Sequence, residues 1–142
     1  MKILVACDGS SHSLCAAAFA IDLIRKSSSE PGSLVLVNVH DDAALRHAKS
    51  IVGASAVSSY LKEVSEEDLT EVRKAAEQSG IPFIVDARTG RVAEQVVASA
   101  TAHGCDLIAM GAKGRGAVLD MLIGSVAQRV LGAAPMPVLF VK

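Results

Sequence analysis

Aromatic residues and prolines are scarce in this sequence, and cysteines are scarcer still. Its 142 residues include three Phe, one Tyr, no Trp, four Pro and three Cys. The cysteines, Cys7, Cys15 and Cys105, show neither CxxC nor Cys/His spacing, which argues against a disulfide framework and against a structural zinc site. We therefore expect a reducing, cytoplasmic setting in which all three are small buried hydrophobic residues.

The sequence also lacks a dominant charge and any long apolar run. Fourteen Lys and Arg against fifteen Asp and Glu leave a formal net charge of −1, so no global field draws the chain onto nucleic acid or anionic lipid. No apolar stretch approaches the ~20 residues that span a bilayer, and the first apolar run is too short for a secretory signal. We expect neither nucleic acid nor membrane as a partner, and any anion site must be local.

Aliphatic residues are the most abundant kind in this sequence. Hydrophobic residues make up 51% of the chain and charged residues 20%, a profile typical of α/β domains whose parallel strands are buried on both faces. A chain of this length can bury about two thirds of the surface that its unfolded form exposes. Neither a repeat nor a composition break divides it, so we expect a single domain over residues 1–142.

Short apolar runs alternate with helical patterns along the whole chain. The predicted strands cover residues 2–7, 33–40, 83–87, 106–110 and 138–141. A first helix follows Ser11 with an apolar stripe of Leu14, Ala18, Ile21 and Ile24, and later helices are expected over residues 60–79, over 91–103 and around 126–131. Residues 41–59 show no sustained period and receive no assignment.

This alternation predicts an open, mostly parallel five-stranded sheet with right-handed crossovers and helices on both faces. In such sheets, ligands bind outside the carboxyl ends of the strands, where the strand order reverses. The turns that follow the strands are therefore the places to look for chemistry.

Two of these turns carry distinctive residues. Asp8-Gly9-Ser10 follows the first strand, and a loop from Gly111 to Gly116 follows the fourth and continues to Gly124-Ser125 at the start of a helix. Glycines let a backbone approach an anion closely, and a helix N-terminus favours phosphate. The plainer interpretation is a set of ordinary loop glycines with an N-cap serine. The sequence has neither GxGxxG after its first strand nor GxxxxGK[ST], so Rossmann dinucleotide and Walker sites are not supported.

Over nearly its whole length the chain resembles the universal stress protein family. The opening Lys2–Ser10 segment looks like that family's first strand and turn, and Leu36–His40 looks like its second strand. Gly111, Gly114 and Gly124-Ser125 reproduce the pattern G-x2-G-x9-G-[ST] of the family's ATP-binding branch. The segment from Pro135 to Val141 is similar to its closing strand.

The resemblance implies a Rossmann-like, adenine nucleotide alpha hydrolase-like fold with strand order 3-2-1-4-5. It implies that Asp8 and the Val39 backbone contact adenine, with Ala6, Met110 and Gly111 near adenine or ribose. The phosphates of ATP would be held by Gly114, Gly124, Ser125 and Val126. The Ser125 hydroxyl could also ligate Mg²⁺ carried by ATP, while no separate protein metal site is expected. The family further implies a homodimer through the C-terminal strand.

Other polar residues receive weaker assignments. Asp8 has no paired acid or histidine at a recognisable spacing, so we interpret it as a binding residue rather than a catalytic one. His12 and His40 follow strands of the ligand edge and could approach a nucleotide. Lys113 and Arg115 flank Gly114, where a phosphate contact and plain solvation are about equally expected.

Three functions stay open from the residues alone. The first is an ATP-binding module of the stress response that regulates rather than catalyses, with slow ATP hydrolysis at most, because no Walker lysine, general base or arginine finger is evident. The second is a nucleotide-free dimeric interaction protein of the same fold. The third is an enzyme on a similar scaffold, such as a nucleotidyl transferase or a relative of electron-transfer flavoproteins.

Overall fold

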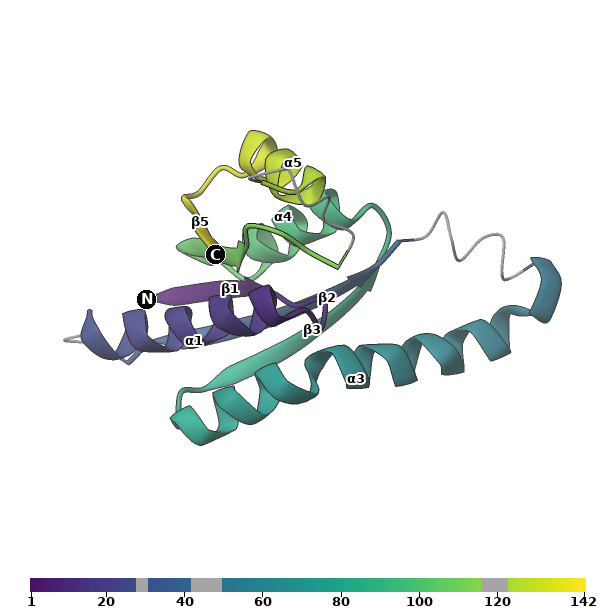
Figure 1. The fold of residues 1–142 in the computed structure, drawn as a ribbon, viewed down its shortest axis with the longest axis horizontal. Helices are drawn as coiled ribbons and strands as arrows, with labels where there is room; N and C mark the ends of the chain where they lie inside the picture. The colour runs from purple at the N-terminus through teal and green to yellow at the C-terminus, as the bar shows by residue number, and fades with distance from the viewer. Residues whose placement is uncertain (28–30, 42–49, 116–122) are drawn as a thin grey trace.

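The computed structural model describes residues 1–27, 31–41, 50–115 and 123–142. Its strands are β1 (Lys2–Ala6), β2 (Ser33–His40), β3 (Phe83–Thr89), β4 (Leu107–Gly111) and β5 (Val138–Val141). Its main helices are α1 (Ser11–Lys26), α3 (Ala54–Ser79), α4 (Val92–Ala102) and α5 (Ser125–Ala133). Strands and helices alternate as the sequence predicts (Figure 1).

The five strands form one parallel sheet in the order β3-β2-β1-β4-β5, which confirms the predicted fold class. β1 lies at the centre, and its Ile3, Leu4 and Val5 are fully buried. The chain leaves β1 toward β2 on one side and later enters β4 on the other. The strand order therefore reverses at β1, and a ligand edge is expected at the carboxyl ends of β1 and β4.

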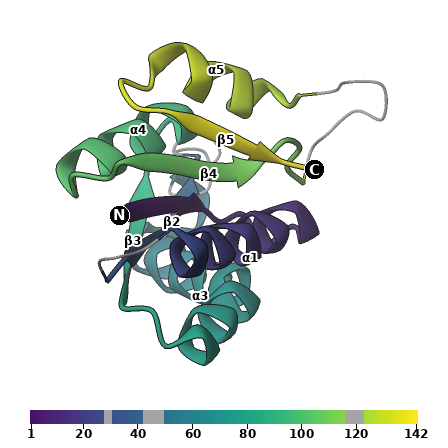
Figure 2. The same cartoon turned by 90° about the vertical axis from the view of Figure 1, so that its left-hand side faces the viewer.

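The helices cover both faces of the sheet (Figure 2). On one face, α1 and α3 pack with the sheet in a core that includes Ile21 and Leu69. On the other face, α4 and α5 pack in a core that includes Val96 and Val130. Because both faces are covered, the central strands read as continuous apolar runs rather than alternating ones.

A polar cluster attaches α4 to the edge strand β3. The same Asp86 carboxylate oxygen accepts hydrogen bonds from Ser99 Oγ at 2.7 Å and from Arg88 Nε at 2.7 Å, and it lies 3.1 Å from His103 Nε2. Burial alone would raise the pKa of Asp86, but these hydrogen bonds outweigh it and hold the pKa below the ordinary carboxyl value. The cluster thus stabilises the ionised carboxylate on the edge strand of the sheet.

Several predicted details are wrong. The stripe predicted on α1 included Ala18, which is exposed, and Leu14, which is only half-buried. Small residues face the sheet instead, namely Ala16, Ala17 and Ala20, each fully buried, because they let the helix lie close to the strands. Cys15 is exposed rather than buried, since it lies on the outer side of the same helix.

Some element boundaries also differ from the predictions. β1 ends at Ala6, one residue early, and β3 continues to Thr89. α3 begins at Ala54, inside the stretch that received no assignment, of which residues 42–49 lie outside the described part. None of the described helices is long and apolar enough to cross a membrane.

Candidate functional site

A cavity of about 380 Å³ opens at the carboxyl ends of β1, β2 and β4, beside the start of α5. This volume lies at the lower end of the range for small-molecule sites. Its lining comprises Ala6, Cys7, Asp8, Ser10, Ser13, Val37, Val39, Val92, Val96, Met110, Gly111, Ala112, Lys113, Gly114, Arg115, Gly124, Ser125, Val126 and Ala127. The cavity therefore lies at the reversal of strand order, where the fold predicts a ligand site.

The nine residues that the family resemblance implies as ligand contacts all lie in this lining: Ala6, Asp8, Val39, Met110, Gly111, Gly114, Gly124, Ser125 and Val126. They come from four separate parts of the chain, and the fold brings them together. The side chains of Val37, Val39, Val92 and Val96 give one part of the wall an aliphatic character. Glycines and polar residues occupy the part beside α5.

The start of α5 faces this polar part of the cavity. Gly124 precedes the helix in an extended conformation, and its N–H donates to the Ala112 carbonyl at 2.8 Å. No side chain in the described part of the chain caps the helix. The first N–H groups of a helix have no intrahelical acceptor and carry the positive end of its dipole. Ser125 and Val126 therefore present donors suited to an anion.

The two glycines of the predicted phosphate loop have different surroundings. A Cβ atom on Gly114 would lie 2.8 Å from Asp8 Oδ2, so a side chain at this position would displace that carboxylate oxygen. A Cβ atom on Gly124 would meet its nearest neighbour, the Ala112 carbonyl oxygen, at an ordinary 3.6 Å. Gly124 is therefore not demanded by protein packing, and the space beside it belongs to the cavity.

Asp8 holds the turn after β1 and the loop after β4 in register. Its Oδ1 accepts hydrogen bonds from Ser10 N at 3.0 Å and Ser10 Oγ at 2.5 Å, while its Oδ2 accepts one from Arg115 N at 3.2 Å. Ser10 Oγ in turn accepts from Ser13 N and caps α1. The carboxylate is thus held by both loops, and a contact with adenine stays a prediction.

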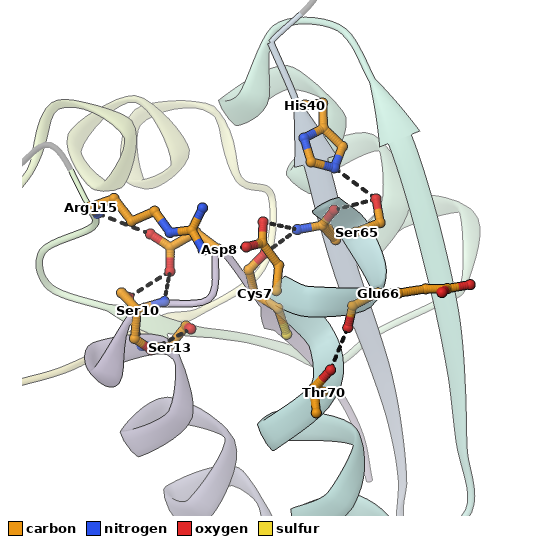
Figure 3. A network of polar contacts seen from close by, with 11 residues as sticks. Cys7, Asp8, Ser10, Ser13, His40, Ser65, Glu66, Thr70 and Arg115 are labelled. Carbon is orange, nitrogen blue, oxygen red and sulfur yellow. Dashed lines mark hydrogen bonds and ion pairs between the residues drawn. The ribbon is translucent and has the colours of Figure 1, made fainter. Parts of the chain in front are cut away.

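A chain of buried polar side chains, which the sequence analysis missed, runs behind this site (Figure 3). Asn38 on β2 donates through Nδ2 to the Cys7 carbonyl at 2.9 Å and to Asp68 Oδ2 at 3.2 Å. Ser65 Oγ donates to Asn38 Oδ1 at 2.8 Å. The other Asp68 oxygen pairs with the Arg115 guanidinium, so α3 is linked directly to the loop after β4.

His40 is the far end of this chain. Its Nε2 lies 2.7 Å from Ser65 Oγ, whose proton is already donated to Asn38, so the histidine must donate from Nε2. Burial lowers the pKa of His40 and the nearby Arg115 lowers it further, while Asp68 opposes them. A neutral histidine protonated at Nε2 therefore fits the site at neutral pH.

The remaining predictions have mixed outcomes. Lys113 and Arg115 do line the cavity, with the Arg115 side chain engaged by Asp68. Neither His12 nor His40 belongs to the lining; His12 packs against Gly111, where a Cβ atom would lie 2.6 Å from the His12 Cβ. Residues 116–122, in the middle of the predicted phosphate loop, lie outside the described part.

Among the described residues of the site, neither a reactive thiol nor a metal-binding cluster is found. Cys7 lines the cavity, but burial, together with the nearby Asp8 and Asp68 charges, raises the pKa of its thiol, so it is no nucleophile at neutral pH. In the described ranges, no three His, Cys, Asp or Glu side chains are grouped to hold a metal ion.

Comparisons with known proteins agree on one family. A profile of the Universal stress protein family matches residues 1–142. Universal stress protein MJ0531 from Methanocaldococcus jannaschii is 36% identical over 141 residues, covering 99% of this chain and 81% of that protein. A universal stress protein from Thermus aquaticus is 34% identical over 142 residues, covering 99% of this chain and 97% of that protein.

Solved structures show the same fold. The hypothetical protein MJ0577 superposes with a TM-score of 0.85 at 24% identity, over 99% of this chain and 94% of that one. Two further matches were solved with nucleotides: a universal stress protein in complex with cAMP, at a TM-score of 0.67 and 20% identity, and an Arabidopsis thaliana family member with AMP bound, at 0.66 and 16%. These cover 100% of this chain and 97% and 91% of theirs. From the profile and the close sequence relatives together, this chain belongs to the universal stress protein family.

Proposed function

We propose that this protein binds ATP in the cavity at the carboxyl ends of β1, β2 and β4 and acts as a nucleotide-dependent regulatory module of the stress response. The observation that carries the proposal is the assembly of all nine predicted contact residues, from Ala6 to Val126, around one cavity. A chance set of loop glycines would not be expected to converge on one space beside a helix N-terminus.

The chemistry of the cavity wall supports a nucleotide. The aliphatic part, with Val39 and Met110, suits the faces of an adenine ring. The opposite part offers the uncapped start of α5 and the glycines Gly114 and Gly124, which suit phosphate oxygens. The Ser125 hydroxyl there could donate to phosphate or ligate Mg²⁺ bound to ATP.

Two structural relatives support an adenine nucleotide as the ligand, since one was solved with cAMP and another with AMP. The match of Gly111, Gly114 and Gly124-Ser125 to the family's ATP-binding pattern favours ATP over AMP here. The triphosphate would extend from the aliphatic part of the cavity toward the first turn of α5.

The lining also supports regulation rather than fast turnover. Phosphoryl transfer uses a residue that orients the nucleophile and a cation directed at the transferring phosphate. Asp8 is held by Ser10 and Arg115, and the Arg115 guanidinium is held by Asp68. We therefore expect at most slow ATP hydrolysis.

The three free cysteines fit a reducing, cytoplasmic setting, which would keep them reduced.

We further propose that β5 pairs with β5 of a second copy. β5 is an edge strand, and Ile108 N and Ala112 N donate to the carbonyls of Pro137 and Val141. Because backbone groups alternate in direction along a strand, the N–H of Val138 points to the open edge. A Val138→Pro substitution should therefore raise the dimer dissociation constant, and sedimentation analysis would measure it.

A matched control for the dimer exists at the opposite edge of the sheet. Leu34 N donates to the Pro82 carbonyl, so by the same alternation Ala87 on β3 also has an outward N–H. Ala87→Pro should leave the dimer intact. A wild-type chain that sediments as a monomer at micromolar concentration would contradict the pairing.

The nucleotide content of the purified protein tests the proposed ligand. Acid extraction and chromatography should release ATP from the wild type and none from a Gly114→Val, Gly124→Val double variant that still folds. An empty wild type that also fails to bind added ATP would favour the nucleotide-free interaction protein. Conversion of ATP to AMP and pyrophosphate, or a bound flavin, would instead indicate an enzyme on this scaffold.

A further inference from the structure

The face of the sheet beneath α1 and α3 is incompletely covered at β5. On this face, α3 contacts β2, while α1 contacts β1, β4 and one side of β5. Leu139 and Val141 of β5 pack against the core on this face but are only half-buried. They therefore form an apolar floor beside the open edge of the sheet, where β5 is the last strand.

Phe19 of α1 extends this apolar surface. Its side chain is 45% exposed. His12 lies two turns earlier on the same helical stripe and packs against Gly111 of β4. Arg25, on the other flank of the helix, donates to the Ser79 carbonyl at the end of α3. Phe19 therefore lies on the flank of α1 that faces β4 and β5.

The height of Phe19 along the sheet follows from the same contact. Gly111, beside His12, is in register with Val141. Since α1 leads from the end of β1 back to the start of the parallel strand β2, it runs antiparallel to the strands. From His12 to Phe19 the helix advances about 10 Å, the same distance as three residues of strand. Phe19 therefore lies at about the height of Val138, next to the floor residue Leu139.

The proposed pairing of β5 needs more than its backbone. β5 has only four residues, so two copies would share about four hydrogen bonds through Val138 and Phe140, each worth about 1 kcal/mol. Stable interfaces bury about 1,200 Å² or more in total and take most of their affinity from a few well-packed side chains. A dimer that persists at micromolar concentration therefore requires apolar surface beside the paired strands.

We propose that Phe19 packs against Phe19 and Leu139 of the partner subunit, across the two-fold axis of the β5 pairing. This inference rests on the dimer proposed above. Antiparallel pairing of Val138 with Phe140 places the axis at Leu139, so the Cα atoms of the two copies of Leu139 lie about 4.5 Å apart. Their side chains point toward the α1 face, where Leu139 already packs.

The spacing of the two α1 helices fits this contact. α1 packs on β4, one strand inward from β5. With strands about 4.8 Å apart, the two helices lie about 15 Å from each other across the axis. Helices in direct contact lie about 8–10 Å apart, so a gap is left between them. One aromatic side chain from each copy spans that gap above the leucine floor.

Sedimentation analysis of matched variants tests the contact. Phe19→Ala should raise the dimer dissociation constant at least about tenfold, because each copy loses a phenyl group from the interface. The side chain is half-exposed in one copy, so the variant should still unfold cooperatively in urea. Ile84, 48% exposed on the opposite edge strand β3, is the control. Ile84→Ala should change the dissociation constant by less than about twofold.

The native Cys15 provides a test that leaves Phe19 in place. It lies one helical turn before Phe19, close to the height of the axis, and is exposed, whereas Cys7 and Cys105 are buried. A disulfide needs Cα atoms within about 7 Å, so oxidation alone should not link the two helices. A bifunctional maleimide long enough to span the gap should link them. Cys15→Ser should abolish this cross-link, and Val138→Pro should reduce it together with the dimer.

The outcomes separate this contact from the dimer itself. A wild-type chain that sediments as a monomer would refute both the β5 pairing and the Phe19 contact. A dimer that Val138→Pro weakens and Phe19→Ala leaves unchanged would retain the pairing and refute the contact. Equal weakening by Phe19→Ala and Ile84→Ala would also refute it, as would the absence of a Cys15 cross-link in a dimer.

Discussion

Asp68 on α3 forms an ion pair with Arg115 in the loop that follows β4. The carboxylate side chain is only 6% exposed, while the arginine is 58% exposed and lines the proposed nucleotide cavity. Asn38 supports the carboxylate from β2. The long helix α3 therefore fixes one wall of a cavity to which it contributes no lining residue.

Because the carboxylate is the buried member of this pair, removing Arg115 alone should cost more stability than removing both charges. Arg115→Ala leaves a buried carboxylate with one donor, and we expect it to lower the free energy of unfolding by about 2 kcal/mol. The double variant Asp68→Asn, Arg115→Ala should cost less than Arg115→Ala alone, because no buried charge remains. Urea unfolding of the full double-mutant cycle measures this, and strictly additive costs would contradict it.

Gly9 gives a second test of the same contact. Its φ is +74°, and a Cβ atom there would lie 2.6 Å from Asp68 Oδ1 and 3.1 Å from Asp68 Cα. Gly80 has nearly the same φ, +72°, but nothing within 4 Å of an added Cβ. In both alanine variants, the left-handed backbone conformation should lower the free energy of unfolding by about 1 kcal/mol. Gly9→Ala should cost at least about 1 kcal/mol more, because it also displaces the ion pair.

Thermal or urea unfolding of the two alanine variants side by side decides the point. Equal losses of stability would contradict the displacement of the Asp68–Arg115 ion pair by a side chain at position 9.

Much of the fold could be predicted because the signals are local. The runs around Leu4 and Ile108 are continuously apolar, and Asp8 or Gly111 follows each of them, as expected for buried parallel strands. The glycines of the cavity could be predicted for a similar reason, since each follows a strand or precedes a helix. The face of α1 was harder, because alanines lie on every side of that helix and only packing decides which of them are buried.

The polar chain behind the cavity could not be predicted, because its members meet only in the fold. Asn38 stands alone in the run Val37-Asn38-Val39, and Asp68 lies in an acidic stretch where a carboxylate is normally solvated. One signal was available. Ser65 and Asp68 fall on the same helical face as Leu69 and Val72, and polar residues on such a face need partners.

The hydrogen-bond chain predicts the protonation of His40. Because burial lowers its pKa below the ordinary 6.5, the stability contributed by neutral His40 is complete above about pH 6.5. It is lost as the pH falls through the folded-state pKa, where the imidazole must become charged. Nitrogen-detected NMR titration should show a pKa below 6.5 and a proton on Nε2 at neutral pH.

The tautomer depends on Ser65, which provides a control. Ser65→Ala removes the acceptor for Nε2–H and should shift the tautomer populations toward those of free histidine. A wild-type His40 protonated mainly at Nδ1 would contradict the direction of the chain.

Asp86 predicts a different pH dependence, at acid pH. Because its folded-state pKa lies below the ordinary 3.8, its contribution is present above about pH 4 and is lost as the pH falls through the folded-state pKa. Asp86→Asn should cost about 1 to 2 kcal/mol at pH 7, and the cost should shrink toward pH 2. The exposed Asp22, paired with Lys26 on α1, is the control. Asp22→Asn should cost less than about 0.5 kcal/mol throughout, and an equal pH profile for both variants would refute the role of the Asp86 cluster.

The most direct test of the proposed function is calorimetric titration of nucleotide-free protein with ATP, comparing two identical substitutions in one segment. Gly124 lines the cavity, and a Cβ atom there would lie 3.6 Å from the Ala112 carbonyl oxygen, whereas Gly132 lies in α5 with nothing within 4 Å of an added Cβ. We expect the wild type and Gly132→Val to bind ATP alike, and Gly124→Val to bind at least about tenfold more weakly while still unfolding cooperatively. Equal ATP affinity in all three proteins would contradict a phosphate site at the start of α5.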